Sequence, residues 1–106
     1  MTWRVLIVDD SRTARLALCQ LLSSDARFEV VGEASSGQEG RRLAKRVSPD
    51  LLTMDVSLGP DEDDGVEATR LIMQETPVPI VIVTGADPGD AELVYRAMAA
   101  GALEVL

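Results

Sequence analysis

Acidic and hydroxyl side chains stand directly after three short apolar runs of the chain, and these residue types could hold a metal ion beside a charged group. They are Asp9, Asp10 and Ser11 after the first run, Asp55 after the third, and Thr84 with Gly85 after the fourth. Carboxylates that lie close together repel one another and raise one another's proton affinity unless a cation lies between them. Magnesium, with its water-rich octahedral oxygen coordination, suits such a set better than a fully enclosed calcium site does. If the acids converge, the sequence predicts a magnesium site.

Asp9 and Asp10 taken alone also have a structural interpretation, because acidic residues favour helix starts. Asp55 weighs against that interpretation. It follows the run from Asp50 to Met54, and a buried strand has no structural use for a carboxylate at its end. Three acids at two strand ends therefore indicate a functional cluster.

The composition excludes several other kinds of chemistry. The sequence contains no histidine and one cysteine, Cys19. This excludes nucleophile systems and general bases that depend on His, HExxH metal sites, an intrachain disulfide and a Cys-based zinc site. Aromatic residues make up 3% of the chain and the net charge is -8, which argues against a nucleic-acid binder. Metal chemistry would have to use oxygen ligands.

The acids and hydroxyls must be positioned by an alternation of strands and helices. A chain of 106 residues allows one domain. Continuous apolar runs are typical of a parallel sheet covered on both faces. They predict strands over Val5–Val8, Phe28–Ala34, Asp50–Met54 and Pro79–Val83, with a short final run over Leu103–Leu106. Apolar residues at helical spacing separate these runs, so we predict an α/β protein with a doubly wound parallel sheet.

In an open sheet of this kind, ligands bind at the carboxyl ends of the strands, where the strand order reverses. If the first and third strands are neighbours, Asp9, Asp10 and Asp55 converge on one crevice.

No apolar stretch reaches transmembrane length, and the amino-terminal run is too short for the core of a signal peptide. We therefore expect a cytoplasmic protein that does not bind membranes.

Helix-start signals agree with the alternation. Ser36 with Glu39 and Asp64 with Glu67 have capping-box spacing, and Asp87-Pro88 places a hydrogen-bond acceptor directly before a proline. Helices are therefore expected to begin after Ser36, Asp64 and Asp87.

Four stretches of the chain carry a resemblance to a known family: Val5 to Ser11, Pro49 to Asp55, Ile80 to Gly85, and Gly101 with Ala102. Together they resemble the receiver domain of two-component response regulators. Within that family, the stretches around Asp55 and before Thr84 are similar to the receiver part of chemotaxis methylesterases. The resemblance covers nearly the whole chain. It implies a flavodoxin-like sheet with strand order 2-1-3-4-5 in a single receiver domain, residues 1–106.

The resemblance implies a phosphoryl switch with a magnesium cofactor. Asp55 would take a phosphoryl group from a histidine kinase or phosphotransfer protein. Asp10 and Asp55 would bind Mg2+ directly, Asp9 would bind it mostly through water, and the backbone carbonyl of Ser57 would complete the protein ligands. Thr84 would donate a hydrogen bond to the phosphoryl group as the switch hydroxyl. An effector domain or partner protein would carry the output.

The sequence departs from the family pattern in two places. The segment from Val56 to Gly65 is about two residues longer than usual, so either the loop bulges or the alignment shifts there, and its acidic residues at 59–64 are interpreted as a solvated charge run. The lysine that the family carries after its fifth strand has no counterpart before Leu106, and Val105 stands where an aromatic switch residue is common. We expect a receiver without its last helix. The exposed face beside the first helix should either lead to self-association, for example as a homodimer, or leave the chain markedly less stable than one extended by a helix.

Other functions remain open at this point. A receiver-like interaction module that is not phosphorylated would account for the missing lysine and the longer loop. Aspartate-nucleophile phosphatases also use acids at strand ends, but the stretch from Asp9 to Arg12 lacks their Asp spacing. A flavin-binding protein is disfavoured because no glycine-bearing phosphate loop follows the first strand and aromatic residues are scarce.

Overall fold

Strands and helices alternate along the chain, and all paired strands are parallel. The computed structural model describes residues 2–56, 64–83 and 91–106, and every structural statement below refers to these residues. The elements are β1 (Trp3–Val8), α1 (Arg12–Ser23), β2 (Phe28–Ala34), α2 (Gly37–Val47), β3 (Leu51–Met54), α3 (Asp64–Glu75), β4 (Ile80–Ile82), α4 (Ala91–Ala99) and β5 (Glu104–Val105).

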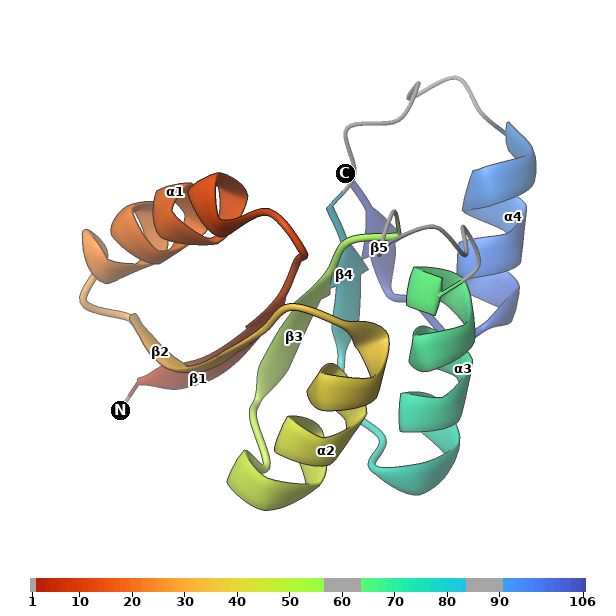
Figure 1. Ribbon diagram of the computed structural model, residues 1–106, viewed down its shortest axis with the longest axis horizontal. Helices are drawn as coiled ribbons and strands as arrows, with labels where there is room; N and C mark the ends of the chain where they lie inside the picture. Colours follow the sequence, from red (N-terminus) through yellow and green to blue (C-terminus); the bar gives the residue numbers. More distant parts are fainter. Residues whose placement is uncertain (1, 57–63, 84–90) are drawn as a thin grey trace.

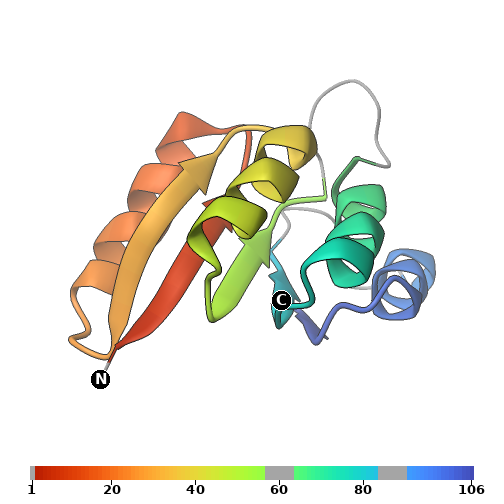
Figure 2. The ribbon, with the colours of Figure 1, turned by 90° about the horizontal axis from the view of Figure 1, so that it is seen from below.

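The strand order is β2-β1-β3-β4-β5, which confirms the predicted doubly wound sheet and its order. Figure 2 shows the strands side by side from β2 at the left to β5 at the right. The order reverses at β1, since β2 lies on one side of it and β3 on the other. The carboxyl ends of β1 and β3 are therefore neighbours, as a ligand site at this point of the sheet requires.

Helices cover both faces, but unequally. Figure 1 shows α1 on one side of the sheet and α2, α3 and α4 on the other. The larger apolar core lies on the α2 to α4 side, where Leu6, Val8 and Met54 pack with buried residues of the helices. Successive strand residues point to opposite faces, so the fully buried Val5 and Ile7 lie on the α1 side.

Two serine caps fix the starts of the first two helices. The Ser11 hydroxyl accepts a hydrogen bond from the Ala14 amide at 3.2 Å, and Ser36 does the same for Glu39 at 3.1 Å. The prediction at Ser36 is thus confirmed. The backbone of α3 begins at Asp64, while Asp87 and Pro88 lie outside the described residues.

The bounds of β1, β3, β4 and β5 differ from the predicted ones by one or two residues. Just before the β3 ladder begins, the Asp50 carboxylate accepts the Arg4 amide at 2.9 Å and the Asp50 amide donates to the Arg4 carbonyl at 2.8 Å. Pro79 has no N–H to donate and contributes only its carbonyl, which accepts from Leu52 at 2.9 Å. The ladder of β4 therefore starts at Ile80.

The outer helices are less buried than their apolar spacing suggests. No residue of α1 is buried, and Leu21 is 67% exposed. In α4 only Ala97 is buried, and Met98 is 48% exposed. Because α1 packs mainly on β1 and β2 and is the single described helix on its face, no other described helix covers its flanks.

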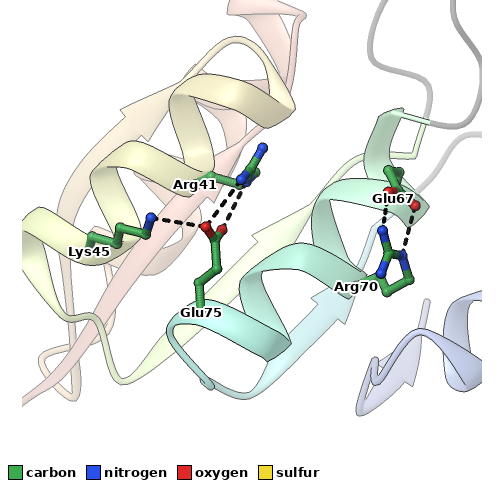
Figure 3. Close-up of polar contacts among 5 residues, drawn as sticks. All are labelled: Arg41, Lys45, Glu67, Arg70 and Glu75. Carbon is green, nitrogen blue, oxygen red and sulfur yellow. Dashed lines mark hydrogen bonds and ion pairs between the residues drawn. The ribbon is translucent and has the colours of Figure 1, made fainter.

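Ion pairs join α2 to α3. Figure 3 shows Glu75 of α3 between two cations of α2, with Arg41 Nε at 3.0 Å and Lys45 Nζ at 3.0 Å. These hydrogen bonds lower the pKa of Glu75 to about 2. Glu67 and Arg70 pair within α3 itself. The pairs around Glu75 hold α2 against α3 beside the core that supports β1 and β3.

Candidate functional site

Three carboxylates meet where β1 and β3 end. Asp9, Asp10 and Asp55 each offer an oxygen atom, and these atoms lie within 4.8 Å of one another. The pairing of β1 with β3 brings the carboxylates together, because Val8 pairs with Met54 and the Asp55 amide donates to the Val8 carbonyl at 2.9 Å. The sequence predicted that these acids would share one crevice if β1 and β3 were neighbours, and the structure brings them together.

Asp9 is the most firmly held of the three. It is 7% exposed, its amide donates to the Ala34 carbonyl at 2.9 Å, and its carboxylate accepts the Ser11 amide at 2.8 Å. Asp10 is exposed and Asp55 is half-buried. The N-cap of α1 is Ser11, so a capping role does not account for the acidic pair. The three acids thus range from the buried Asp9 through the half-buried Asp55 to the exposed Asp10.

Gly65 places the start of α3 directly against the backbone of Asp55. A Cβ at this position would come closer than 3.0 Å to both the Val56 Cα and the Asp55 carbonyl oxygen. The Gly65 backbone therefore lies directly against the Asp55 peptide. The predicted difference in loop length falls on residues 57–63, which lie outside the described residues.

Several residues predicted from the sequence cannot be placed. Ser57, Thr84 and Gly85 lie outside the described residues, as do positions 59–63 of the acidic run. Their roles remain predictions. The described part of the site consists of the three carboxylates, the backbone that holds them and the glycine beneath Asp55.

Sequence reasoning missed one residue beside the acids. Arg15 of α1 donates from Nη1 to the Asp9 carbonyl at 2.7 Å. The only signal in the sequence was that Arg15 follows the acidic pair by about one helical turn. This signal is weak, because a basic residue on a helix is usually solvated. The contact depends on how α1 leaves β1, which no local pattern encodes.

The donor set suits a small hard divalent cation. Three carboxylate oxygens within 4.8 Å repel one another strongly, and oxygen ligands with open positions for water are those that Mg2+ prefers. The residues therefore fit the magnesium ion expected from the resemblance.

None of the described helices is long and apolar enough to cross a membrane.

Comparisons with known proteins agree on one family. The family model for the response regulator receiver domain matches residues 5–106. A protein-glutamate methylesterase/protein-glutamine glutaminase of Anaeromyxobacter dehalogenans is 50% identical over 103 residues, and one of Syntrophus aciditrophicus is 48% identical over 104. Each match covers 97% of this chain, which spans 30% and 29% of the respective relatives.

Solved structures show the same fold. The response regulator domain of Thermotoga maritima CheB has a TM-score of 0.93 and 32% identity, with 100% of this chain and 78% of that chain covered. A chain in the CheX-CheY-BeF3-Mg2+ complex of Borrelia burgdorferi has a TM-score of 0.87 and 25% identity, with 98% and 76% covered.

Proposed function

This chain belongs to the response regulator receiver family of two-component signalling, and we propose that its Asp55 accepts a phosphoryl group from a histidine kinase or phosphotransfer protein. The observation that carries the proposal is the meeting of Asp55 with Asp9 and Asp10 at the carboxyl ends of β1 and β3. A receiver is a regulatory domain, and the output of this one would pass to an effector domain or partner protein.

The proposed transfer is a displacement at phosphorus. A carboxylate oxygen of Asp55 forms a bond to phosphorus, the bond from phosphorus to the imidazole nitrogen of the donor breaks, and that nitrogen keeps the electron pair. The product is an acyl phosphate on Asp55. Such transfers depend mainly on positioning and on neutralising oxygen charge. A bound Mg2+ would supply that neutralisation at the phosphoryl oxygens.

Four residues of the chain are proposed to bind the metal ion. Asp10 and Asp55 would hold Mg2+ directly, Asp9 mostly through water, and the Ser57 carbonyl would be the last protein ligand. The firm anchoring of Asp9 supports its outer role, because its carboxylate already accepts the Ser11 amide. The similar fold in the Borrelia burgdorferi complex, which contains beryllofluoride and Mg2+, supports a magnesium-dependent phosphoryl site in this chain.

The relatives suggest a setting for the switch. The matched proteins are named as methylesterases, and this chain spans about 30% of their length. We propose that it regulates chemotactic output in the cytoplasm, through an enzyme of that kind or through a separate partner.

Labelling of Asp55 tests the proposal. The chain is incubated with acetyl phosphate and Mg2+, and the phosphoryl adduct is followed by intact mass and located by peptide mapping. We expect label on the parent, none on Asp55→Asn, and greatly reduced label on Asp10→Asn. A parent that takes no label under conditions that label a known receiver would favour the interaction module that is not phosphorylated.

Thermal melts test the metal assignment separately. If the Mg2+ dissociation constant is on the order of 1 mM, then about 10 mM Mg2+ stabilises the parent by roughly 1.4 kcal/mol through mass action. Asp55→Asn relieves carboxylate repulsion, so without metal it should be no less stable than the parent. An equal magnesium response in the parent, Asp10→Asn and Asp55→Asn would refute the assignment.

Thr84 is proposed to act after transfer. Thr84→Ala should still be labelled at Asp55, because the hydroxyl is not needed for attack. It should fail to transmit the change to α4, since the donor that follows the phosphoryl group is gone. Amide shifts of α4 on addition of beryllofluoride provide the measurement. Equal shifts in the parent and the variant would indicate that Thr84 merely ends a strand.

A further inference from the structure

One guanidinium joins the three segments that surround Asp9. Arg15 of α1 donates from Nη1 to the Asp9 carbonyl at 2.7 Å, and its Nε lies 3.3 Å from a carboxylate oxygen of Glu33 in β2. The Arg15 side chain is 18% exposed, whereas that of Glu33 is 44% exposed. Arg15 is therefore a largely buried cation that spans α1, the turn after β1 and the neighbouring strand.

The carbonyl that Arg15 binds is not satisfied by the backbone of the helix. The Arg15 amide donates to the Ser11 carbonyl at 3.0 Å, two residues beyond Asp9. The Asp9 carbonyl lies between the end of the β1 ladder and the start of α1, and among the described residues no backbone amide of either element donates to it. A backbone acceptor this close to the core needs a partner, and Arg15 provides it.

Fixing this carbonyl also fixes Asp10. The Asp9 carbonyl and the Asp10 amide belong to one peptide unit, which is planar and rigid. Asp9 has further anchors at its amide and its carboxylate, whereas Asp10 is exposed. The orientation of that peptide unit therefore determines where the Asp10 carboxylate stands relative to Asp55.

We propose that Arg15 is a positioning residue for the divalent-cation site, holding the turn after β1 so that Asp9 and Asp10 face Asp55. The inference rests on the proposed function, because it concerns the same three carboxylates. A positioning contact and a simple charge effect change Mg2+ affinity in opposite directions. A nearby cation repels Mg2+, so removing its charge alone would raise the affinity. Losing a contact that positions the ligands would lower the affinity.

Magnesium titration of two variants distinguishes these cases. Arg15→Met keeps the apolar stem and removes the hydrogen bonds and the charge. Arg15→Lys keeps the charge and one donor but cannot span Asp9 and Glu33 together. Contacts behind metal ligands are typically worth tenfold or more in metal affinity. We expect Mg2+ affinity to fall about tenfold in Arg15→Met and less in Arg15→Lys. Arg12→Met is the control, since Arg12 is exposed on the same helix.

Calorimetric titration with MgCl2, well below the melting temperature of each variant, gives the affinities. Melts in EDTA show whether each variant is folded. Unchanged or tighter binding in Arg15→Met overturns the inference, as does an equal loss in Arg12→Met. If Arg15→Met does not fold, Arg15→Lys decides, and parental affinity in that variant overturns the inference. A parent that binds no Mg2+ refutes the proposed function itself, and the inference with it.

Discussion

Gly65 has no side chain, and this allows α3 to begin against the backbone of Asp55. A Cβ there would press on the Val56 Cα and the Asp55 carbonyl, neither of which can move without moving the site. We expect Gly65→Ala to destabilise the fold by about 1–3 kcal/mol, as overpacking usually does. It should also slow the labelling of Asp55. Denaturant unfolding and the labelling rate with acetyl phosphate provide the two measurements.

Gly32→Ala is the matched control for that variant. A Cβ at Gly32 would lie 3.2 Å from Leu6 Cδ1, a milder contact with the end of a side chain rather than with the backbone of the site. The control should keep the parental labelling rate. If Gly65→Ala were labelled as fast as the parent, the contact with Asp55 would be structural only.

The acids of the site could be predicted from the sequence, but their supports could not. Asp9, Asp10 and Asp55 follow apolar runs, and strand ends in a parallel sheet meet at one edge. The Arg15 bond to the Asp9 carbonyl depends on the angle between α1 and β1, which is set by tertiary packing. Thr84 was singled out by its place after an apolar run, but its role and that of Ser57 were inferred from resemblance alone and remain predictions.

At the scale of elements, the carboxylate of Glu75 links α2 to α3 through Arg41 and Lys45. Hydrogen bonds from both cations lower its pKa from an ordinary 4.5 to about 2. A carboxyl whose pKa is depressed on folding stabilises the folded state above its unfolded pKa. That stabilisation is lost as the pH falls from about 4.5 toward 2.

Glu75→Gln should therefore melt below the parent at pH 7, and the difference should shrink as the pH falls from about 4.5 toward 2. Other acids titrate in both proteins, so their effects largely cancel in the difference between the two melting temperatures. Glu104→Gln, on the exposed start of β5, is the control and should follow the parent at every pH. If the difference in melting temperature between Glu75→Gln and the parent stays constant from pH 7 to 2, the ion pairs of Glu75 do not contribute to the stability of the fold.

Element order was predictable and element burial was not. Phe28–Ala34 was predicted with the bounds that β2 has, because a seven-residue run of this kind is long enough to define both ends. The apolar spacing of α1 predicted a packed stripe, yet Leu21 is 67% exposed. Periodicity identifies the face of a helix that could be buried, whereas the neighbours on that face depend on the whole sheet.

The whole molecule has one face of its sheet only partly covered by helices. On the α1 side, Thr53 of β3 is 7% exposed and its hydroxyl has no hydrogen-bond partner among the residues that the structure describes, while Val81 of β4 is half-buried. Ile80 and Ile82 belong to the core on the other side, so Val81 points toward the α1 face. Figure 1 shows no described helix on that side of β3, β4 and β5.

We expect this half-covered face to lead the 106-residue chain to self-associate, or to leave it less stable than a chain lengthened by a helix after Leu106. Covering apolar surface contributes about 25 cal/mol per Å², so even a small contact area shifts the equilibrium measurably. Sedimentation across a range of concentrations should show species larger than a monomer. Val81→Lys should favour the monomer, because burying an unpaired charge in such a contact is costly. If the parent is a monomer at every concentration, and its melting temperature does not change when the helix is added, then this face needs no covering.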